Sequence, residues 1–307
     1  MATQSGGAVQ LIKQSFKGFS EDDCPTMAAA LSYYTVFSLP PLLVLLLTIL
    51  GAVLDPQDIQ GTLETQMRDA MGASGAEQVR TILANADRPG AGGLVPTILS
   101  VVALLLGATG VFGQLQAALN KAWNVAPDPE KGGIKNMLLK RVFGIGMVLG
   151  LAFILLVSLV VSAMLSAFGE QLGRFLPSGL SAPVLEAINF VGSLAVISLL
   201  FGAIFKVLPD AEIGWRDVAV GAVVTGLLFV AGKFALGLYL GRSNPGEAFG
   251  AAGALALMLV WIYYSSMIVM LGAEFTQAWA ERRGSGIVPE KGAVRVVRET
   301  RRLAESH

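Results

Sequence analysis

Six apolar stretches, each at least 20 residues long and nearly free of charge, dominate this chain. A helix of about 20 apolar residues crosses the ~30 Å hydrocarbon core of a bilayer. Charged residues make up only 14% of the chain, against roughly 25% in soluble domains. Because a segment in lipid must satisfy its own backbone hydrogen bonds, the pattern predicts an all-α, polytopic membrane protein with six transmembrane helices. The predicted spans are 28–54, 94–113, 142–165, 184–208, 218–240 and 249–275.

Lysines and arginines are divided unevenly between the two sets of segments that alternate along these spans. One set, which contains both termini, carries sixteen of them, the other set carries five, and Lys233 lies inside the fifth span. Cytoplasmic loops of membrane proteins carry an excess of Lys and Arg. The bias therefore predicts that both termini are cytoplasmic. The first apolar run is too long for the core of a cleaved signal peptide, so we expect it to be retained as a span.

The segments outside the six-span domain (28–275) carry shorter amphipathic patterns. Residues 1–27 predict a cytoplasmic N-terminus with an interfacial helix. The outer-side loop 55–93 has apolar residues at helical spacing and predicts two short helices lying over the bundle. Residues 276–307 form a basic cytoplasmic tail, which we expect to be solvated. The stripe of the interfacial helix is Ile12, Phe16 and Phe19, and its opposite side carries Lys13 and Lys17.

The first span contains two adjacent helix breakers, Pro40 and Pro41, near its middle. A proline lacks the N–H group and crowds the carbonyl four residues earlier, here those of Val36 and Phe37. Carbonyls freed at this depth need protein or cavity water as partners. The pair therefore predicts a bent span that faces protein or water at mid-depth. Two interpretations stay open: a packing kink, or a discontinuous helix whose bare carbonyls face a substrate path.

Two charged residues lie within predicted spans, where ionisable groups are costly and often functional. Lys233 either lines a polar cavity that suits a phosphate or carboxylate substrate, or extends its ammonium to the outer interface along an apolar stem. Glu274 ends the last span. It is either a charge at the cytoplasmic interface, paired with Lys206 or Lys121, or a coupling or gating carboxylate.

Aromatic residues fall inside the first and last spans rather than only at their ends. Aromatic belts belong at membrane interfaces, so a belt does not explain an aromatic residue at mid-span. Core packing and a ligand-facing role both remain open for these residues. Trp123 and Asn120, just past the second span, fit an interfacial anchor and a helix cap. The aromatic candidates are Tyr33, Tyr34, Trp261 and Tyr264, and Ser265 and Ser266 follow in the last span.

Pairs of small residues four positions apart recur in the later spans. Ala222 and Gly226 form such a pair in the fifth span, and Gly146 and Gly150 form one in the third. Small residues at this spacing let two helix backbones approach closely. The pattern predicts close helix crossings, within the chain or with another copy.

The residue types that enzymes and metal sites need are scarce. The chain has one cysteine, Cys24, and one histidine, His307, which leaves no disulfide framework and no histidine-based metal site. The acidic residues between spans lack metal-site spacing, and no phosphate-binding loop or dinucleotide motif appears. The basic residues follow the membrane-orientation rule and do not call for nucleic acid. We therefore expect no enzyme activity, no cofactor and no bound nucleic acid, and a ribonuclease is the function that the residues favour least.

Four segments together resemble the YihY/BrkB family of bacterial inner-membrane proteins. They are AAALSYYTVFSLPPLLVLLLTILG (28–51), LQAALNKAWNV (115–125), FKVLPDAEIGWRDVAVGAVVTGLLF (205–229) and YLGRSNPGEAFGAAGALALMLVWIYYSSMIVMLGAEF (239–275). The resemblance covers roughly residues 10–285. It implies six spans with both ends inside, in a bacterial inner membrane. Members have been labelled ribonuclease BN and serum-resistance factor, and some are linked to envelope lipid export. The family has no established catalytic residue to carry over.

Two classes of function fit these observations. The first is a transporter or flippase-like exporter of an envelope lipid, glycolipid or polar solute, which would use the broken first span and Lys233. The second is a structural or partner-binding envelope protein that moves no substrate. The expected partners are membrane lipids, with a homo-oligomer or an envelope protein in addition.

Overall fold

The computed structural model describes residues 5–50, 60–61, 64–65, 68, 80–81, 110–130, 181–243, 253–284 and 286–297. Long helices make up most of this part of the chain. The predicted third span, most of the second and most of the outer loop lie outside the described residues. The helices are α1 (Ser5–Glu21), α2 (Cys24–Leu50), α6 (Ser181–Val207), α7 (Trp215–Ser243) and α9 (Gly253–Arg283), and a further helix runs through 110–122.

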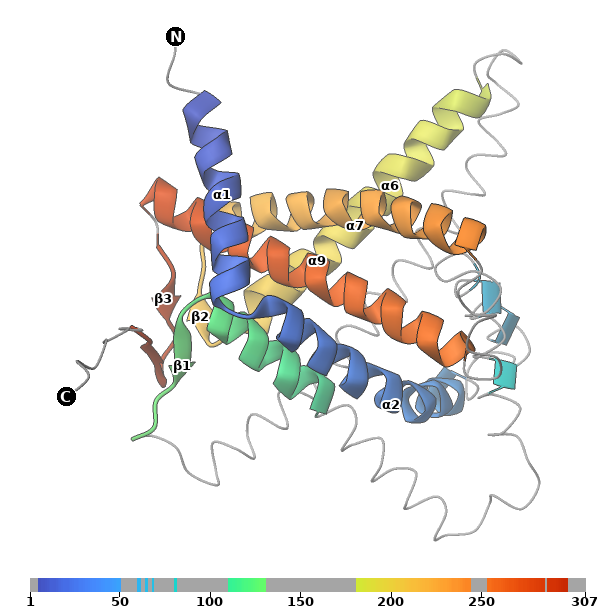
Figure 1. The fold of residues 1–307 in the computed structure, drawn as a ribbon, viewed down its shortest axis with the longest axis horizontal. Coiled ribbons are helices and arrows are strands. Elements are labelled where there is room, and N and C mark those ends of the chain that lie inside the picture. The colour runs from blue at the N-terminus through green and yellow to red at the C-terminus, as the bar shows by residue number, and fades with distance from the viewer. Residues whose placement is uncertain are drawn as a thin grey trace, which may run out of the picture.

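Helix α9 lies at the centre of the described bundle. It packs against α1, α2 and α7, and α7 in turn packs against α6. Figure 1 shows α2, α7 and α9 running lengthwise, with α1 crossing them at one end. Helices α6, α7 and α9, which correspond to the last three predicted spans, therefore pack in sequence, with α7 between the other two.

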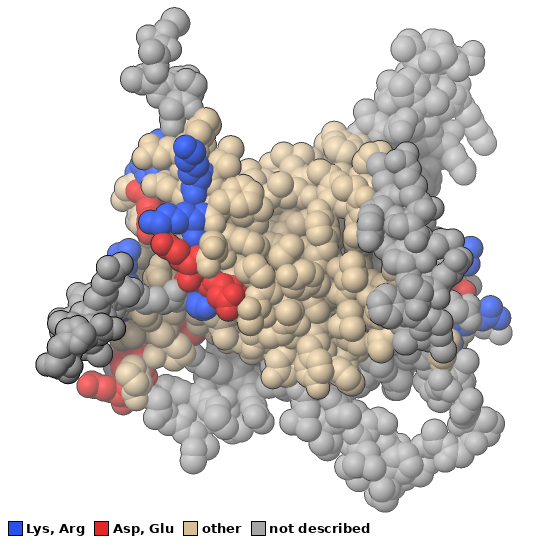
Figure 2. Space-filling model, viewed as in Figure 1, with Lys and Arg blue, Asp and Glu red and all other residues tan. Residues whose placement is uncertain are grey.

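Three described helices are long and apolar enough to cross a membrane: Phe190–Val207, Trp215–Leu236 and Leu255–Arg283. They agree with the fourth, fifth and sixth predicted spans. Many of their large apolar side chains are exposed, among them Leu199, Phe234 and Val260, as expected of helices whose outer faces meet lipid. Figure 2 shows charged residues around α1 and the strands, and next to them a broad face without described charged residues. The described bundle thus presents an apolar surface suited to a bilayer.

Helices α7 and α9 interlock through two glycines and two threonines. Thr276 of α9 packs on Gly221 of α7, and Thr225 of α7 packs on Gly272 of α9, so closely that a methyl group on either glycine would overlap the threonine hydroxyl. Each threonine hydroxyl donates to the glycine carbonyl one turn earlier on its own helix, at 2.7 Å in both cases. This reciprocal contact brings two backbones close together, as small residues do in membrane bundles.

The contact between α6 and α7 uses the small pair that the sequence indicated. A Cβ on Gly202 would lie 3.5 Å from the Ala222 methyl group, and one on Gly226 would lie 2.7 Å from Ser198 Oγ. The prediction that Ala222 and Gly226 mark a close crossing is confirmed, and their partner is α6 of the same chain. The pair Gly146 and Gly150 lies outside the described residues.

Two short antiparallel ribbons close one end of the bundle. Strand β1 (Val125–Pro127) pairs with β4 (Ala293–Arg295), and β2 (Ala211–Glu212) pairs with β3 (Val288–Pro289). Figure 1 shows all four strands beside the end where α9 finishes, which we call the strand end. Strands β1 and β2 come from two different inter-span segments and both pair with the tail, so these three segments lie at the same end of the bundle.

The tail is docked over 286–297 by backbone pairing, although many of its described side chains remain exposed. Val296 N donates to Asn124 O at 2.8 Å, and Glu290 N donates to Asp210 O at 3.0 Å. Ile287 is buried in the main apolar core. Strands of two or three residues are too short to show an alternating pattern, so the sequence gives no indication that the tail pairs with β1 and β2.

The core at the strand end is built around Trp123. This side chain is 2% exposed, its Nε1 donates to Ala273 O at 3.0 Å, and its ring meets Phe205 edge-on at 5.9 Å. The interfacial anchor expected here is therefore wrong: Trp123 joins the helix at 110–122 to α6 and α9. Its indole N–H finds a partner inside the protein, which is what a buried tryptophan requires.

Candidate functional site

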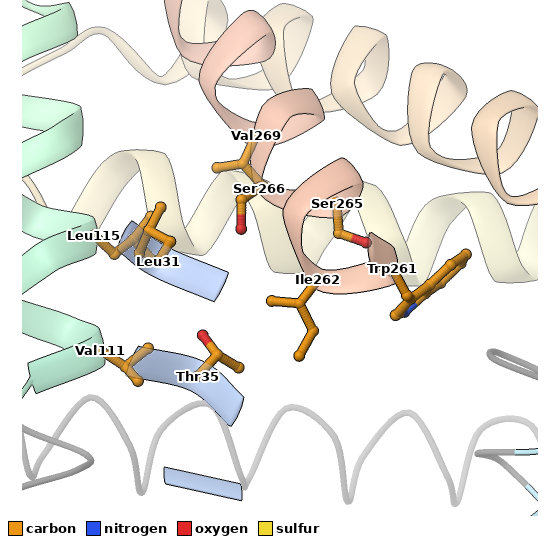
Figure 3. Close-up of a pocket in the computed structure, with 9 residues that line it drawn as sticks. All are labelled: Leu31, Thr35, Val111, Leu115, Trp261, Ile262, Ser265, Ser266 and Val269. Atoms are coloured by element: carbon orange, nitrogen blue, oxygen red, sulfur yellow. The ribbon is translucent and has the colours of Figure 1, made fainter. Parts of the chain in front are cut away.

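A cavity of about 190 Å³ lies between α2, the helix at 110–122 and α9. Figure 3 shows residues from these three elements around it, with the hydroxyls of Thr35 and Ser266 turned toward the space between α2 and α9. The rest of the wall is apolar. The lining residues are Leu31, Thr35, Val111, Leu115, Trp261, Ile262, Ser265, Ser266 and Val269.

Ser265 carries a buried hydroxyl that has no hydrogen-bond partner within the part of the chain that the structure describes. Leaving such a group unpaired costs about 1–3 kcal/mol. Figure 3 shows this hydroxyl turned toward Trp261, away from Thr35 and Ser266, so a water in the cavity does not reach it. The cavity therefore offers the hydroxyls of Thr35 and Ser266 to a ligand, and the rest of its wall is apolar.

Trp261 forms one side of this cavity and packs against the neighbouring helix. The side chain is half-buried, and its ring meets Phe229 of α7 edge-on at 6.1 Å. The two interpretations left open for Trp261 are thus compatible, because one face of the ring packs while the residue lines a space.

The tyrosine candidates do not line the cavity. Tyr33 and Tyr34 are exposed on α2, at 58% and 41%, and the Tyr34 ring lies against Gly110. The Tyr264 hydroxyl packs directly on the backbone of Gly232 in α7. Pro40 and Pro41 lie within α2, whose backbone is helical through both of them, and the side chains of 39–50 are outside the described residues.

Lys233 is exposed on α7. Neither this cavity nor the larger one described below includes it in its wall. The structure therefore does not bring Lys233 together with Trp261 in the described part of the bundle.

Glu274 is buried at the strand end of α9, at 2% exposure. Its Oε1 accepts from Cys24 Sγ at 3.6 Å. Gly18 of α1 lies so close to the carboxylate that a side chain there would overlap it. Lys206, one expected partner, instead donates to Ile213 O at 2.6 Å and lies over the Trp215 ring. Glu274 thus joins α1, α2 and α9.

The same cluster perturbs the single cysteine. Burial raises the pKa of the Cys24 thiol, the negative charges of Glu274 and Asp22 raise it further, and the ammonium of Lys121 lowers it. Cys24 precedes the predicted first span by one turn and is fully buried. It is therefore a protonated thiol in the folded protein at neutral pH, and a poor nucleophile.

A second and larger cavity, of about 440 Å³, lies at the strand end between the helix at 110–122, β1 and Asp210. Asp210 accepts from Gln116 Nε2 at 3.1 Å and from Asn120 Nδ2 at 2.9 Å. Asp210 N donates back to Asn120 Oδ1 at 2.9 Å. Asn120, which we expected to cap its helix, instead ties that helix to the α6–β2 link.

Sequence reasoning did not select Asp210, Gln116 or Cys24. The spacing of Gln116 and Asn120 by one turn was visible, since residues four apart share a helix face. Their acceptor lies about 90 positions along the chain, as the separations of 94 and 90 residues show. No local pattern could link them.

Comparison with known proteins gives a single family. The family model described as Virulence factor BrkB matches residues 15–296. A UPF0761 membrane protein of Alkalilimnicola ehrlichii is 30% identical over 85% of this chain and 56% of its own length. A UPF0761 membrane protein of Pseudomonas aeruginosa is 27% identical over 94% of this chain and 68% of its own. The ribonuclease-like protein YfkH of Bacillus subtilis is 24% identical over 90% of this chain and 97% of its own.

The chain spans little more than half the length of the Alkalilimnicola relative. No solved structure matches the chain. The resemblance drawn from the four sequence segments is confirmed by the family match.

Proposed function

Because the chain belongs to the BrkB family of membrane proteins, we propose that it is a transporter or flippase-like exporter of an envelope lipid, glycolipid or polar solute. We further propose that it resides in the bacterial inner membrane with six spans and both termini in the cytoplasm. The family and the apolar helices support membrane residence. The transport activity rests on the cavity.

The observation that carries the proposal is the hydroxyl-bearing cavity between α2, the helix at 110–122 and α9. Membrane bundles pack tightly, so a space into which the hydroxyls of Thr35 and Ser266 turn is costly unless something occupies it. The volume of about 190 Å³ is below the ~300–1,000 Å³ of typical ligand pockets. It accommodates a few water molecules or part of a headgroup, so passage of a lipid requires the cavity to widen.

The experiment compares two half-buried serines. The hydroxyl of Ser266 turns into the cavity, whereas Ser198 of α6 is absent from its wall. Purified protein is reconstituted into vesicles with fluorescent phospholipids, glycolipids or polar solutes, and flux is measured. We expect Ser266→Ala to lower the flux severalfold and Ser266→Leu to block it, while Ser198→Ala leaves it unchanged. Equal effects of the two alanine variants would remove the cavity from the mechanism.

Absence of flux for every substrate, together with a captured envelope protein, would support the alternative of a non-transporting structural or partner-binding protein. A homo-oligomer, detected by cross-linking in the vesicles, is compatible with either function. Membrane lipids are partners in both.

Lys233 provides a separate test of the substrate path. Because its side chain is exposed on α7 and absent from both cavity walls, we propose that its ammonium reaches the membrane interface. Lys233→Met then leaves flux nearly unchanged. A complete loss of flux in folded protein would instead support the polar-cavity role.

We propose that the protein is not an enzyme and binds neither a cofactor nor nucleic acid. One relative bears a ribonuclease-like name, and that name describes the relative alone. Within the described ranges no group of three His, Cys, Asp or Glu could hold a metal ion. Metal-dependent cleavage of a defined RNA by pure protein, lost when Asp210 or Glu212 is changed to Ala, would refute this.

A further inference from the structure

Helix α1 has one face packed on the protein and an opposite face that nothing described covers. Leu11 and Ser15 are buried, at 7% and 3% exposure, and Gly18 faces Glu274 of α9. Residues three and four apart share a helix face, so these three define the packed side.

The outward face of α1 is apolar. Val9, Ile12 and Phe16 follow one another at three and four positions, and their exposed fractions are 55%, 52% and 58%. Three large apolar side chains in one exposed row are unfavourable in water, because each exposed apolar surface costs about 25 cal/mol per Å². An apolar environment must cover this row.

Positive charge flanks the apolar row. Lys13 and Lys17 lie beside it on the helix surface. Lys17 pairs with Glu21 at 3.6 Å, and both side chains are largely exposed, so the pair is weak in water. Lys13 has no ion pair among the described residues. A helix with an apolar row bordered by lysines suits an interface whose headgroups are anionic.

The position of α1 agrees with that environment. Figure 1 shows it crossing the end of the lengthwise helices, and Figure 2 shows its charged residues next to the face that lacks described charges. A helix that crosses the ends of the spans at this boundary lies where the headgroups of a bilayer would be.

We infer that α1 is a docking surface for an anionic lipid leaflet, with Val9, Ile12 and Phe16 inserted among the acyl chains and Lys13 and Lys17 on the headgroups. The helix is also fixed to α9, because Arg282 donates to Gly7 O and Gly18 packs on Glu274. Lipid bound by α1 therefore sets how deeply the strand end of α9 lies in the membrane. This inference does not depend on the protein being a transporter.

Full-length protein in vesicles tests the inference with a fluorescent probe. An environment-sensitive maleimide is attached at Phe16→Cys on the apolar row, or at Gln14→Cys, which is exposed on another side of α1. The wild type, whose only cysteine is buried, gives the background. We expect a blue-shifted emission and severalfold stronger quenching by nitroxide-labelled acyl chains at position 16 than at position 14, while aqueous iodide quenches mainly position 14.

The lysines are tested by the lipid composition. Adding phosphatidylglycerol to phosphatidylcholine vesicles deepens the blue shift at position 16, and the double substitution Lys13→Gln and Lys17→Gln removes that increase. Equal quenching at both positions by iodide would overturn the inference. A position 16 probe that neither iodide nor the labelled lipid reaches would also overturn it, since a protein or a second copy would then cover this face.

Discussion

Trp123 is the largest fully buried side chain among the described residues, and its replacement tests its role in the core at the strand end. It fills a site at 2% exposure, donates one hydrogen bond to Ala273 O at 3.0 Å and meets Phe205 edge-on. A buried Trp→Ala change typically costs about 3–5 kcal/mol, because it removes transfer free energy and leaves a cavity. This range already includes the loss of the Trp123 hydrogen bond. The Ala273 carbonyl is not left unpaired, because it still accepts a hydrogen bond within α9.

The expected shift in the melting temperature follows from this cost. At roughly 2–4 °C per kcal/mol for domains of 150–250 residues, Trp123→Ala should lower Tm by about 6–20 °C. Trp123→Phe keeps an aromatic ring but loses the indole N–H donor, and it should lower Tm by a few degrees.

The chain contains its own reporter for the measurement. Cys24 is its only cysteine and is fully buried, so a thiol-reactive fluorogenic maleimide labels it only when the strand end opens. A thermal ramp in detergent then reports the unfolding of this region. The matched control is Trp215→Ala, because Trp215 is 72% exposed and exposed substitutions usually change stability by less than about 0.5 kcal/mol.

Equal Tm values for Trp123→Ala and Trp215→Ala would refute the assignment of Trp123 to the core. A lowered Tm in which Trp123→Phe equals Trp123→Ala would assign the stability to the hydrogen bond rather than to packing.

Three other changes follow from the described contacts. Gly221→Ala places a methyl group where the Thr276 hydroxyl lies and should destabilise the protein by about 1–3 kcal/mol. The control Gly202→Ala brings its methyl group only to ordinary van der Waals distances and should be tolerated. Both are measured by thermal unfolding followed by circular dichroism. Burial raises the pKa of Cys24, so the unfolded thiol loses its proton near pH ~8.5 while the folded thiol keeps it. The free energy of unfolding should therefore fall as the pH rises above that value. Cys24→Ser should flatten the Tm–pH profile between neutral and strongly alkaline pH. A chain ending at Gly284 lacks β3 and β4 and should show faster amide hydrogen exchange at 125–127 and 211–212, while a chain ending at Val297 keeps both ribbons and should exchange like the full chain.

The span pattern could be predicted because it is a local property of the sequence. A run of about 20 apolar residues is recognisable without knowing its neighbours, and the last three predicted spans agree with apolar helices in the structure. The small pair Ala222 and Gly226 was recognisable for the same reason. The Gly272–Thr276 pair has the same spacing and could have been found with it.

The strand end could not be predicted, because its contacts join segments far apart in the chain. Cys24 and Glu274 are separated by 250 positions, and Trp123 and Ala273 O by 150. A charged or aromatic residue at the end of a span is normally assigned to the interface. Both side chains are instead buried within the protein, Glu274 against Gly18 of α1 and Trp123 against Phe205 of α6.

The cavity was predictable in part. Trp261 was selected because a belt does not explain an aromatic residue at mid-span, and it does line the cavity. The turn of the Ser266 hydroxyl into the cavity depends on the helix packing around it, which a single sequence does not contain.

The described contacts indicate which helix moves if the cavity widens. Helices α7 and α9 are interlocked by the reciprocal packing of Gly221, Thr276, Thr225 and Gly272, and separating them would break two close-packed contacts at once. The cavity wall on the other side of α9 comes from α2 and the helix at 110–122. Helix α2 also contains the adjacent prolines, which remove two backbone hydrogen bonds, and prolines are common sites of kinks. We therefore expect α2 to move relative to α9 while α7 stays fixed to it.

Paired spin labels on exposed positions test this expectation by electron paramagnetic resonance in vesicles of phosphatidylcholine and phosphatidylglycerol. Phe37, Phe234 and Leu255 are exposed, at 65%, 70% and 45%, on α2, α7 and α9 respectively, so labels there should not disturb packing. The distance distribution between labels at 37 and 255 should be broad or bimodal, and that between 234 and 255 should be narrow. The reverse result would mean that the glycine and threonine contacts between α7 and α9 open more easily than the α2 contact, and the cavity would then widen from the α7 side.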